Sequence, residues 1–129
     1  MEVLASRVLL RPLDPARSLH FYRDVLGLEI YREFPGGTVF FLGSGFLELS
    51  GRSDGPPGGS VGLWLRVRDV AAAFAELADR GATVLSEPRM QPWGLREAWV
   101  ADPDGIRIAL VEVPPDHPMR RDTRADPGA

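Results

Sequence analysis

The sequence predicts an α+β domain built from two β-α-β-β-β modules, which form a curved mixed sheet with the helices on its outer face. Three observations support this prediction. A strand-like run followed by a capped helix occurs near the start of the 129 residues and again after the midpoint. Three further strand-like runs follow each helix candidate. Residues 51–60 contain no large hydrophobic side chain and separate the two patterns, which is typical of a linker.

The first module is expected over residues 7–50. Its first strand, 7–12, closes at Pro12, because proline interrupts strand pairing. Asp14 and Pro15 suit a helix start, since Asp caps the first amides and Pro fits the first turn. Gly27 is a typical helix stop. The sequence then predicts strands at 29–34, 38–42 and 46–50, separated by glycine-containing turns.

The second module is expected over residues 61–113. A strand at 61–67 precedes a helix at 70–80, which Asp69 caps and Gly81 ends. The remaining strands are predicted at 83–87, 95–101 and 106–113, and Asp102-Pro103-Asp104-Gly105 turns the last hairpin. Residues 1–113 thus make one domain, and the polar, Pro-rich residues 114–129 are expected to be a mobile tail.

Composition excludes several function classes. A net charge of −3 argues against nucleic-acid binding, which needs a concentrated basic surface. The chain has no cysteine and no lysine, so thiolate nucleophiles, disulfides and lysine Schiff bases are excluded. It shows no signal-peptide pattern and no apolar run near the roughly 20 residues of a membrane span. We therefore expect a cytoplasmic protein that binds neither nucleic acid nor membrane.

Two motifs carry a resemblance to a known family. Residues 18–28, Ser-Leu-His-Phe-Tyr-Arg-Asp-Val-Leu-Gly-Leu, and the turn at 102–105 lie at corresponding places of the duplicated pattern. Together with the repeat, which spans 7–113, they make the chain resemble the vicinal oxygen chelate superfamily of glyoxalase, bleomycin-resistance and dioxygenase proteins. The motif residues are also ordinary core and turn residues, so they indicate the fold and leave the reaction open.

The resemblance implies four metal-ligand positions on the concave sheet, usually filled by His, Gln or Glu. In this sequence they fall on Arg7, Glu48, Gly62 and Ala109. Glycine and alanine offer no side-chain ligand, and arginine has no free lone pair. A single carboxylate does not hold a catalytic ion tightly. We therefore expect no metal and no cofactor.

Strand alternation predicts which side chains share the concave face. Arg7, Glu48, Trp64, Arg66 and Arg107 belong to that face, and Trp93 lies in a loop expected at its rim. The opposite face is uniformly aliphatic and is expected to pack under the helices; it consists of Val8, Leu10, Leu47, Leu49, Leu63, Leu65, Ile106, Ile108 and Leu110.

Two interpretations of the concave residues remain open. Arg7 and Glu48 either form a salt bridge that fills the vacated metal site or contact a polar ligand, with Arg7 binding an anion or Glu48 acting as a base. Trp64 is either a core residue or, beside Gly62, a surface on which a planar ligand stacks.

The resemblance therefore favours a metal-free small-molecule-binding protein of the glyoxalase/bleomycin-resistance type, which sequesters a drug or metabolite in a concave pocket. The missing ligands weigh against catalysis. The resemblance to this superfamily also implies a homodimer. The alternatives are a lyase, dioxygenase or thiol-transferase type enzyme with a non-standard site, and a structural or regulatory dimer without a ligand.

Overall fold

The computed structural model describes residues 1–57, 59 and 61–120. The first module contains β1 (Arg7–Leu10), α1 (Pro15–His20), a π-helical turn η1 (Phe21–Val25), β2 (Ile30–Phe34), β3 (Gly37–Leu42) and β4 (Gly45–Ser50). The second module contains β5 (Gly62–Arg66), α2 (Val70–Asp79), β6 (Thr83–Met90), β7 (Arg96–Ala101) and β8 (Arg107–Glu112). A short 3₁₀ turn, η2 (Pro118–Arg120), follows β8.

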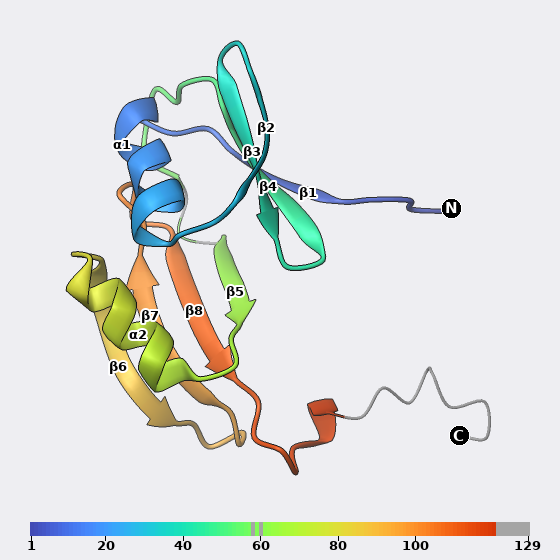
Figure 1. Ribbon diagram of the computed structural model, residues 1–129, viewed down its shortest axis with the longest axis vertical. Coiled ribbons are helices and arrows are strands. Elements are labelled where there is room, and N and C mark those ends of the chain that lie inside the picture. The colour runs from blue at the N-terminus through green and yellow to red at the C-terminus, as the bar shows by residue number, and fades with distance from the viewer. Residues whose placement is uncertain (58, 60, 121–129) are drawn as a thin grey trace.

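The two modules have the same strand topology, which confirms the predicted fold class. One sheet has the order β1-β4-β3-β2 and the other the order β5-β8-β7-β6. In each sheet the first and last strands of the module are parallel, and the remaining pairs are antiparallel. Within the described residues, hydrogen bonding gives two four-stranded sheets instead of one continuous curved sheet (Figure 1).

The helix starts follow the sequence signals closely. The Asp14 carboxylate accepts a hydrogen bond from the Arg17 amide at 3.3 Å, and the Asp69 carboxylate accepts one from the Ala72 amide at 3.0 Å. Each satisfies an amide that has no partner within its helix. Gly27 and Gly81 have φ values of 77° and 88°, a conformation in which glycine carries no steric penalty.

The first helix differs from the prediction in its second half. The sequence predicted one helix up to Gly27, but α1 ends at His20 and a π turn continues to Val25. The Leu26 amide donates to the Phe21 carbonyl at 2.7 Å, which is the five-residue spacing of a π-helix. Apolar spacing over so few residues does not distinguish an α turn from a π turn.

Strand boundaries agree with the prediction to within one or two residues, except in β6. The sequence predicted 83–87, whereas β6 continues through Pro88 to Met90 and pairs Arg89 with Glu97 of β7. The continuation is possible because β6 is an edge strand with register shifts, and a proline on such a strand leaves no ladder hydrogen bond unmade.

The larger of two hydrophobic clusters spans both modules and confirms the predicted strand alternation, and the smaller one includes Ala109 and Val111 on the other face of β8. Leu10, Leu47 and Leu49 of the first sheet lie in the same buried cluster as Leu63, Ile108 and Leu110 of the second. Val8 and Leu65 pack against this cluster, and the helices add Phe21, Tyr22, Val70 and Leu77. The opposite face of each sheet points away from the helices, and we call it the open face.

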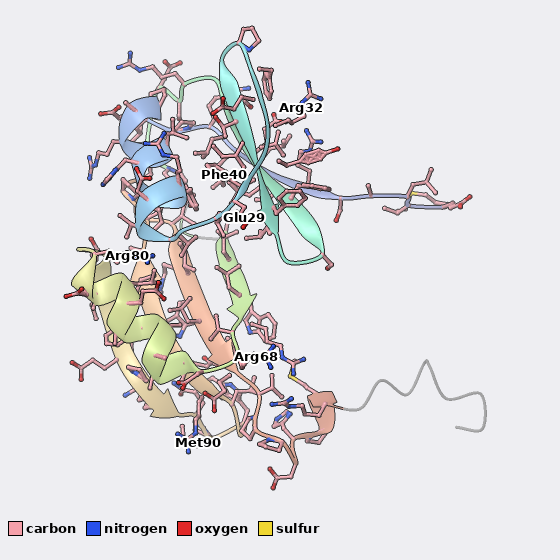
Figure 2. The ribbon with its side chains drawn as sticks, in the orientation of Figure 1. Glu29, Arg32, Phe40, Arg68, Arg80 and Met90 are labelled. Atoms are coloured by element: carbon pink, nitrogen blue, oxygen red, sulfur yellow. The ribbon has the colours of Figure 1, made fainter. Side chains whose placement is uncertain are left out.

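Polar contacts also fasten the modules together. The Tyr22 hydroxyl donates to Asp102 Oδ2 at 2.8 Å, and the Leu13 amide donates to Asp104 Oδ2 at 3.2 Å. Arg80, at the end of α2, donates to the Val25 carbonyl at 3.2 Å (Figure 2). The Asp-Pro-Asp-Gly turn of the second module therefore also forms hydrogen bonds with the first module.

The segment after β8 contacts the second module in its described part. Arg120 donates to the Val113 carbonyl from Nε at 3.0 Å and from Nη2 at 2.7 Å. The His117 ring nitrogen Nε2 lies 3.0 Å from the Trp93 carbonyl oxygen. These contacts hold residues 114–120 against the second module, and the rest of the predicted tail, 121–129, lies outside the described residues.

Candidate functional site

A cleft of about 600 Å³ lies between the two modules, beside the edge strand β5. The first module contributes Leu26 and Leu28, which follow η1, and Leu42 to Ser44 of the β3–β4 turn. The second module contributes residues 64–67, and Leu77 and Glu76 of α2. Its volume falls within the range of small-molecule sites, and a mostly apolar lining with a few polar groups is typical of them.

Trp64 and Arg66 both line this cleft. Half of the Trp64 surface is exposed, so its ring is available for stacking. The cleft, however, is not the concave sheet face that the sequence predicted. It forms where the first module meets the unpaired edge of β5, so it also takes Leu65 and Leu110 from the core side. The packing of the two modules determines the position of the cleft, and strand alternation alone does not predict that position.

Arg7 and Glu48 form an ion pair on the open face of the first sheet. Arg7 Nη1 lies 2.7 Å from Glu48 Oε1, and the Ser50 hydroxyl donates to Glu48 Oε2 at 2.8 Å. The hydrogen bond from Ser50 and the adjacent guanidinium lower the pKa of Glu48 below its ordinary value. Of the two interpretations drawn from the sequence, this geometry matches the salt bridge that fills the vacated metal site. Neither residue lines the cleft.

Arg107 and Trp93 each have an aromatic or polar partner on the second module. The Arg107 guanidinium stacks over the Trp99 ring, 5.3 Å from its centre. Trp93 Nε1 donates to Glu97 Oε2 at 2.7 Å, and Glu97 is only 5% exposed. Neither Arg107 nor Trp93 lines the cleft. The predicted site residues therefore separate into a β5 group, an Arg7–Glu48 pair and these partnered residues.

A second hollow, of about 340 Å³, adjoins the cleft at Arg66 and Val67. Its other lining residues are Arg68 and Arg120, and we call it the arginine recess. Neither arginine was predicted from the sequence to be a site residue. Arg68 follows the last residue of β5 and was assigned to no strand face, and Arg120 was placed in the tail. Their proximity depends on the path of residues 114–120.

The four family metal positions do not fit a divalent ion in this chain. Arg7 is a cation already paired with Glu48, and Ala109 is fully buried. Gly62 has no side chain, and a Cβ there would stand 3.0 Å from the Arg107 carbonyl oxygen, which leaves little room for a longer side chain. Across the described ranges, no group of three or more His, Cys, Asp or Glu side chains is positioned to hold an ion.

Comparisons with known proteins agree with this fold. A curated relative from Synechocystis sp., named a probable lactoylglutathione lyase, is 32% identical over 119 residues, which cover 81% of this chain and 91% of that protein. TnmS3, described as an antibiotic binding protein from Streptomyces sp., has a TM-score of 0.74 and 28% identity, with 88% and 98% of the two chains covered. A glyoxalase/bleomycin resistance protein/dioxygenase from Nocardioides has a TM-score of 0.76 at 20% identity, covering 92% and 89% of the chains.

In the described part of the chain, no helix has the length and apolarity needed to cross a bilayer.

The model of one family, described as the Glyoxalase/Bleomycin resistance protein/Dioxygenase superfamily, matches residues 5–110. The match spans both modules and agrees with the sheet topology and with the relatives above. The chain therefore belongs to the Glyoxalase/Bleomycin resistance protein/Dioxygenase superfamily.

Proposed function

We propose that this chain is a metal-free small-molecule-binding member of its superfamily, which sequesters a drug or metabolite in the cleft beside β5. The observation that carries the proposal is the cleft itself, with a half-exposed Trp64 in an otherwise largely aliphatic lining. A flat aromatic surface in an apolar hollow favours a planar or hydrophobic ligand.

Two further observations support binding without catalysis. The family metal positions hold residues that do not fit an ion, so chemistry that depends on that ion lacks its ligands here. The similar structure of TnmS3 belongs to a protein described as antibiotic binding. A pocket that holds a molecule without transforming it requires only shape, apolar surface and a few polar contacts.

The second candidate function is that of a lyase, because a relative at 32% identity is named a probable lactoylglutathione lyase. This candidate is tested by assaying purified protein for breakdown of lactoylglutathione, with and without added divalent metals. Turnover above background, together with metal bound stoichiometrically after purification, would overturn the metal-free proposal.

Tryptophan fluorescence tests the binding proposal directly. The chain has three tryptophans, so a Trp64→Phe variant isolates the signal of the cleft. We expect aromatic drugs to quench the wild type and to lose most of that quenching in Trp64→Phe, while Trp93→Phe, which lies outside the cleft, keeps it. Equal quenching of wild type and Trp64→Phe would place the ligand elsewhere and contradict the proposal.

We extend the proposal to a cytoplasmic homodimer. Tyr31, Phe41 and Phe46 form an aromatic cluster on the open face of the first sheet, with ring centres 4.8–5.7 Å apart. Tyr31 and Phe41 are nearly half exposed, and exposed apolar patches commonly mark interaction surfaces. Light scattering after size exclusion is expected to give twice the 14.2 kDa chain mass, and to give the single mass for Phe41→Asp. Cell fractionation tests the location.

A further inference from the structure

The arginine recess concentrates positive charge on a chain that is acidic overall. Arg66, Arg68 and Arg120 line one hollow of about 340 Å³, whereas the whole chain has a net charge of −3. In Figure 2, Arg68 is labelled where the chain leaves β5 for α2. Three like charges around one hollow repel each other, so their grouping is unfavourable unless an anion compensates it.

The neighbouring carboxylates are engaged with backbone amides. Among residues 1–57, 59 and 61–120, none of the three recess arginines has a carboxylate oxygen within 4 Å. Asp69 accepts from the Ala72 amide, and Glu112 Oε1 accepts from the Val70 amide at 3.0 Å. These two carboxylates therefore accept hydrogen bonds from backbone amides in the first turn of α2.

Arg120 is held in place before any ligand arrives. Two of its nitrogens, Nε and Nη2, donate to the Val113 carbonyl oxygen, which fixes the plane of the guanidinium and leaves Nη1 without a partner among the described residues. A pre-oriented guanidinium loses less side-chain entropy when it binds an anion, and its planar fork matches carboxylate, sulfonate or phosphate oxygens.

The recess and the cleft are one continuous surface. Arg66 and Val67 line both hollows, and Trp64 lines the cleft two residues before Arg66 on the same face of β5. A molecule that covers Trp64 therefore reaches Arg66 with an adjacent group. Of the described residues that line the cleft, Glu76 alone carries a carboxylate, and it is already paired with Arg80 Nη2 at 2.5 Å.

We infer that the ligand of this protein is an amphipathic anion, whose apolar body lies against Trp64 in the cleft and whose anionic oxygens bind in the arginine recess. This inference rests on the proposed binding function and names the chemical class of the ligand. A cationic ligand is disfavoured, because its charged end would enter a hollow lined by three arginines.

A pair of fluorescent probes separates the two hollows. Anilinonaphthalene sulfonate and N-phenylnaphthylamine share the same aromatic body, and only the first carries an anionic group. We expect both to bind and Trp64→Ala to weaken both, with the sulfonate at least about tenfold tighter, as two or three partly exposed ion pairs allow. Added salt is expected to weaken the sulfonate more than the neutral probe.

Matched variants test the recess. Arg68→Gln/Arg120→Gln is expected to remove most of the preference for the sulfonate, and Arg68→Gln alone to remove part of it without disturbing the Val113 contact. The control Arg89→Gln/Arg96→Gln has the same net charge and touches neither hollow, so it is expected to keep the preference.

The outcomes are distinguishable. Equal affinities of the two probes, or an unchanged preference in both recess variants, would overturn the anion inference while leaving the binding proposal intact. Failure of both probes to bind the wild type, or tight binding of both to Trp64→Ala, would overturn the proposed cleft function itself.

Discussion

Tyr22→Phe removes one hydroxyl from the junction between the modules and leaves the ring in place. The hydroxyl donates to Asp102 Oδ2 at 2.8 Å, and the amides of Asp104 and Ile106 donate to Oδ1. Tyr22 is fully buried and Asp102 is 4% exposed, so water does not replace the lost donor. A hydrogen bond to a charged group contributes about 1.5–3 kcal/mol. We therefore expect the variant to lose about 2 kcal/mol, or about 4–10 °C in Tm.

The loss is expected to depend on pH. Burial raises the pKa of Asp102 above its ordinary 3.8, although its hydrogen bonds with Tyr22, Ile106 and Asp104 oppose the shift. Because the folded pKa exceeds the unfolded one, ionisation of Asp102 costs stability as pH rises through this interval. Without the hydroxyl the folded carboxylate is less stabilised still. The difference in free energy of unfolding between wild type and Tyr22→Phe should therefore be largest near neutral pH. It should become smaller in acid, as Asp102 becomes protonated.

Urea unfolding of both proteins at pH 7 and pH 4 measures the gap. Tyr31→Phe is the matched control, because Tyr31 is the only other tyrosine and is nearly half exposed; it should change stability by less than about 0.5 kcal/mol. A Tyr22→Phe protein as stable as the wild type at pH 7, or a gap that widens in acid, would refute this account of the junction.

Three further predictions concern single sites. Asp69→Ala should cost about 0.5–2 kcal/mol in urea unfolding through the lost cap of α2, whereas Asp79→Ala, which removes an acid at the opposite end of α2, should be neutral or slightly stabilising. Ser50→Ala should raise the pKa of Glu48 toward 4.5 in an NMR titration, because the Ser50 hydroxyl is the main cause of its lowering; stability from Glu48 ionisation is present above 4.5 and lost as pH falls through the lower folded value. Gly62→Ala should destabilise by about 1 kcal/mol, because the new Cβ meets the Arg107 carbonyl at 3.0 Å, while Gly55→Ala, with open space around it, should not.

The module pattern was predictable because its signals are local. Asp14 and Asp69 act on amides three residues away, and the alternation of Leu47, Glu48 and Leu49 assigns each residue to one face of a strand. The aliphatic face was predicted correctly for the same reason, although alternation did not indicate that Ala109 and Val111, on the other face of β8, are buried as well.

The proposed binding surface was only partly predictable, because it depends on contacts between distant segments. Trp64 and Arg66 were found from alternation, but the cleft also needs Leu26 and Leu28 of the other module. Arg120 reaches the recess through its bond to Val113, and no periodic pattern in the sequence encodes that return of the chain. Glu97 was also not predicted as the hydrogen-bond partner of Trp93, although the alternation of β7 places it on the same face as Trp99.

The π turn at Phe21–Val25 determines how the chain arrives at the cleft. A π turn contains about one residue more than an α turn, and each helical residue advances by about 100° around the axis. Because the wider π turn absorbs the extra residue within one turn, deleting one residue from it is expected to give an α turn and to leave Leu26 and Leu28 of the cleft wall in nearly the same orientation. The helix that leads to the cleft can thus lose one residue at this turn without any substitution among the residues that line the cleft.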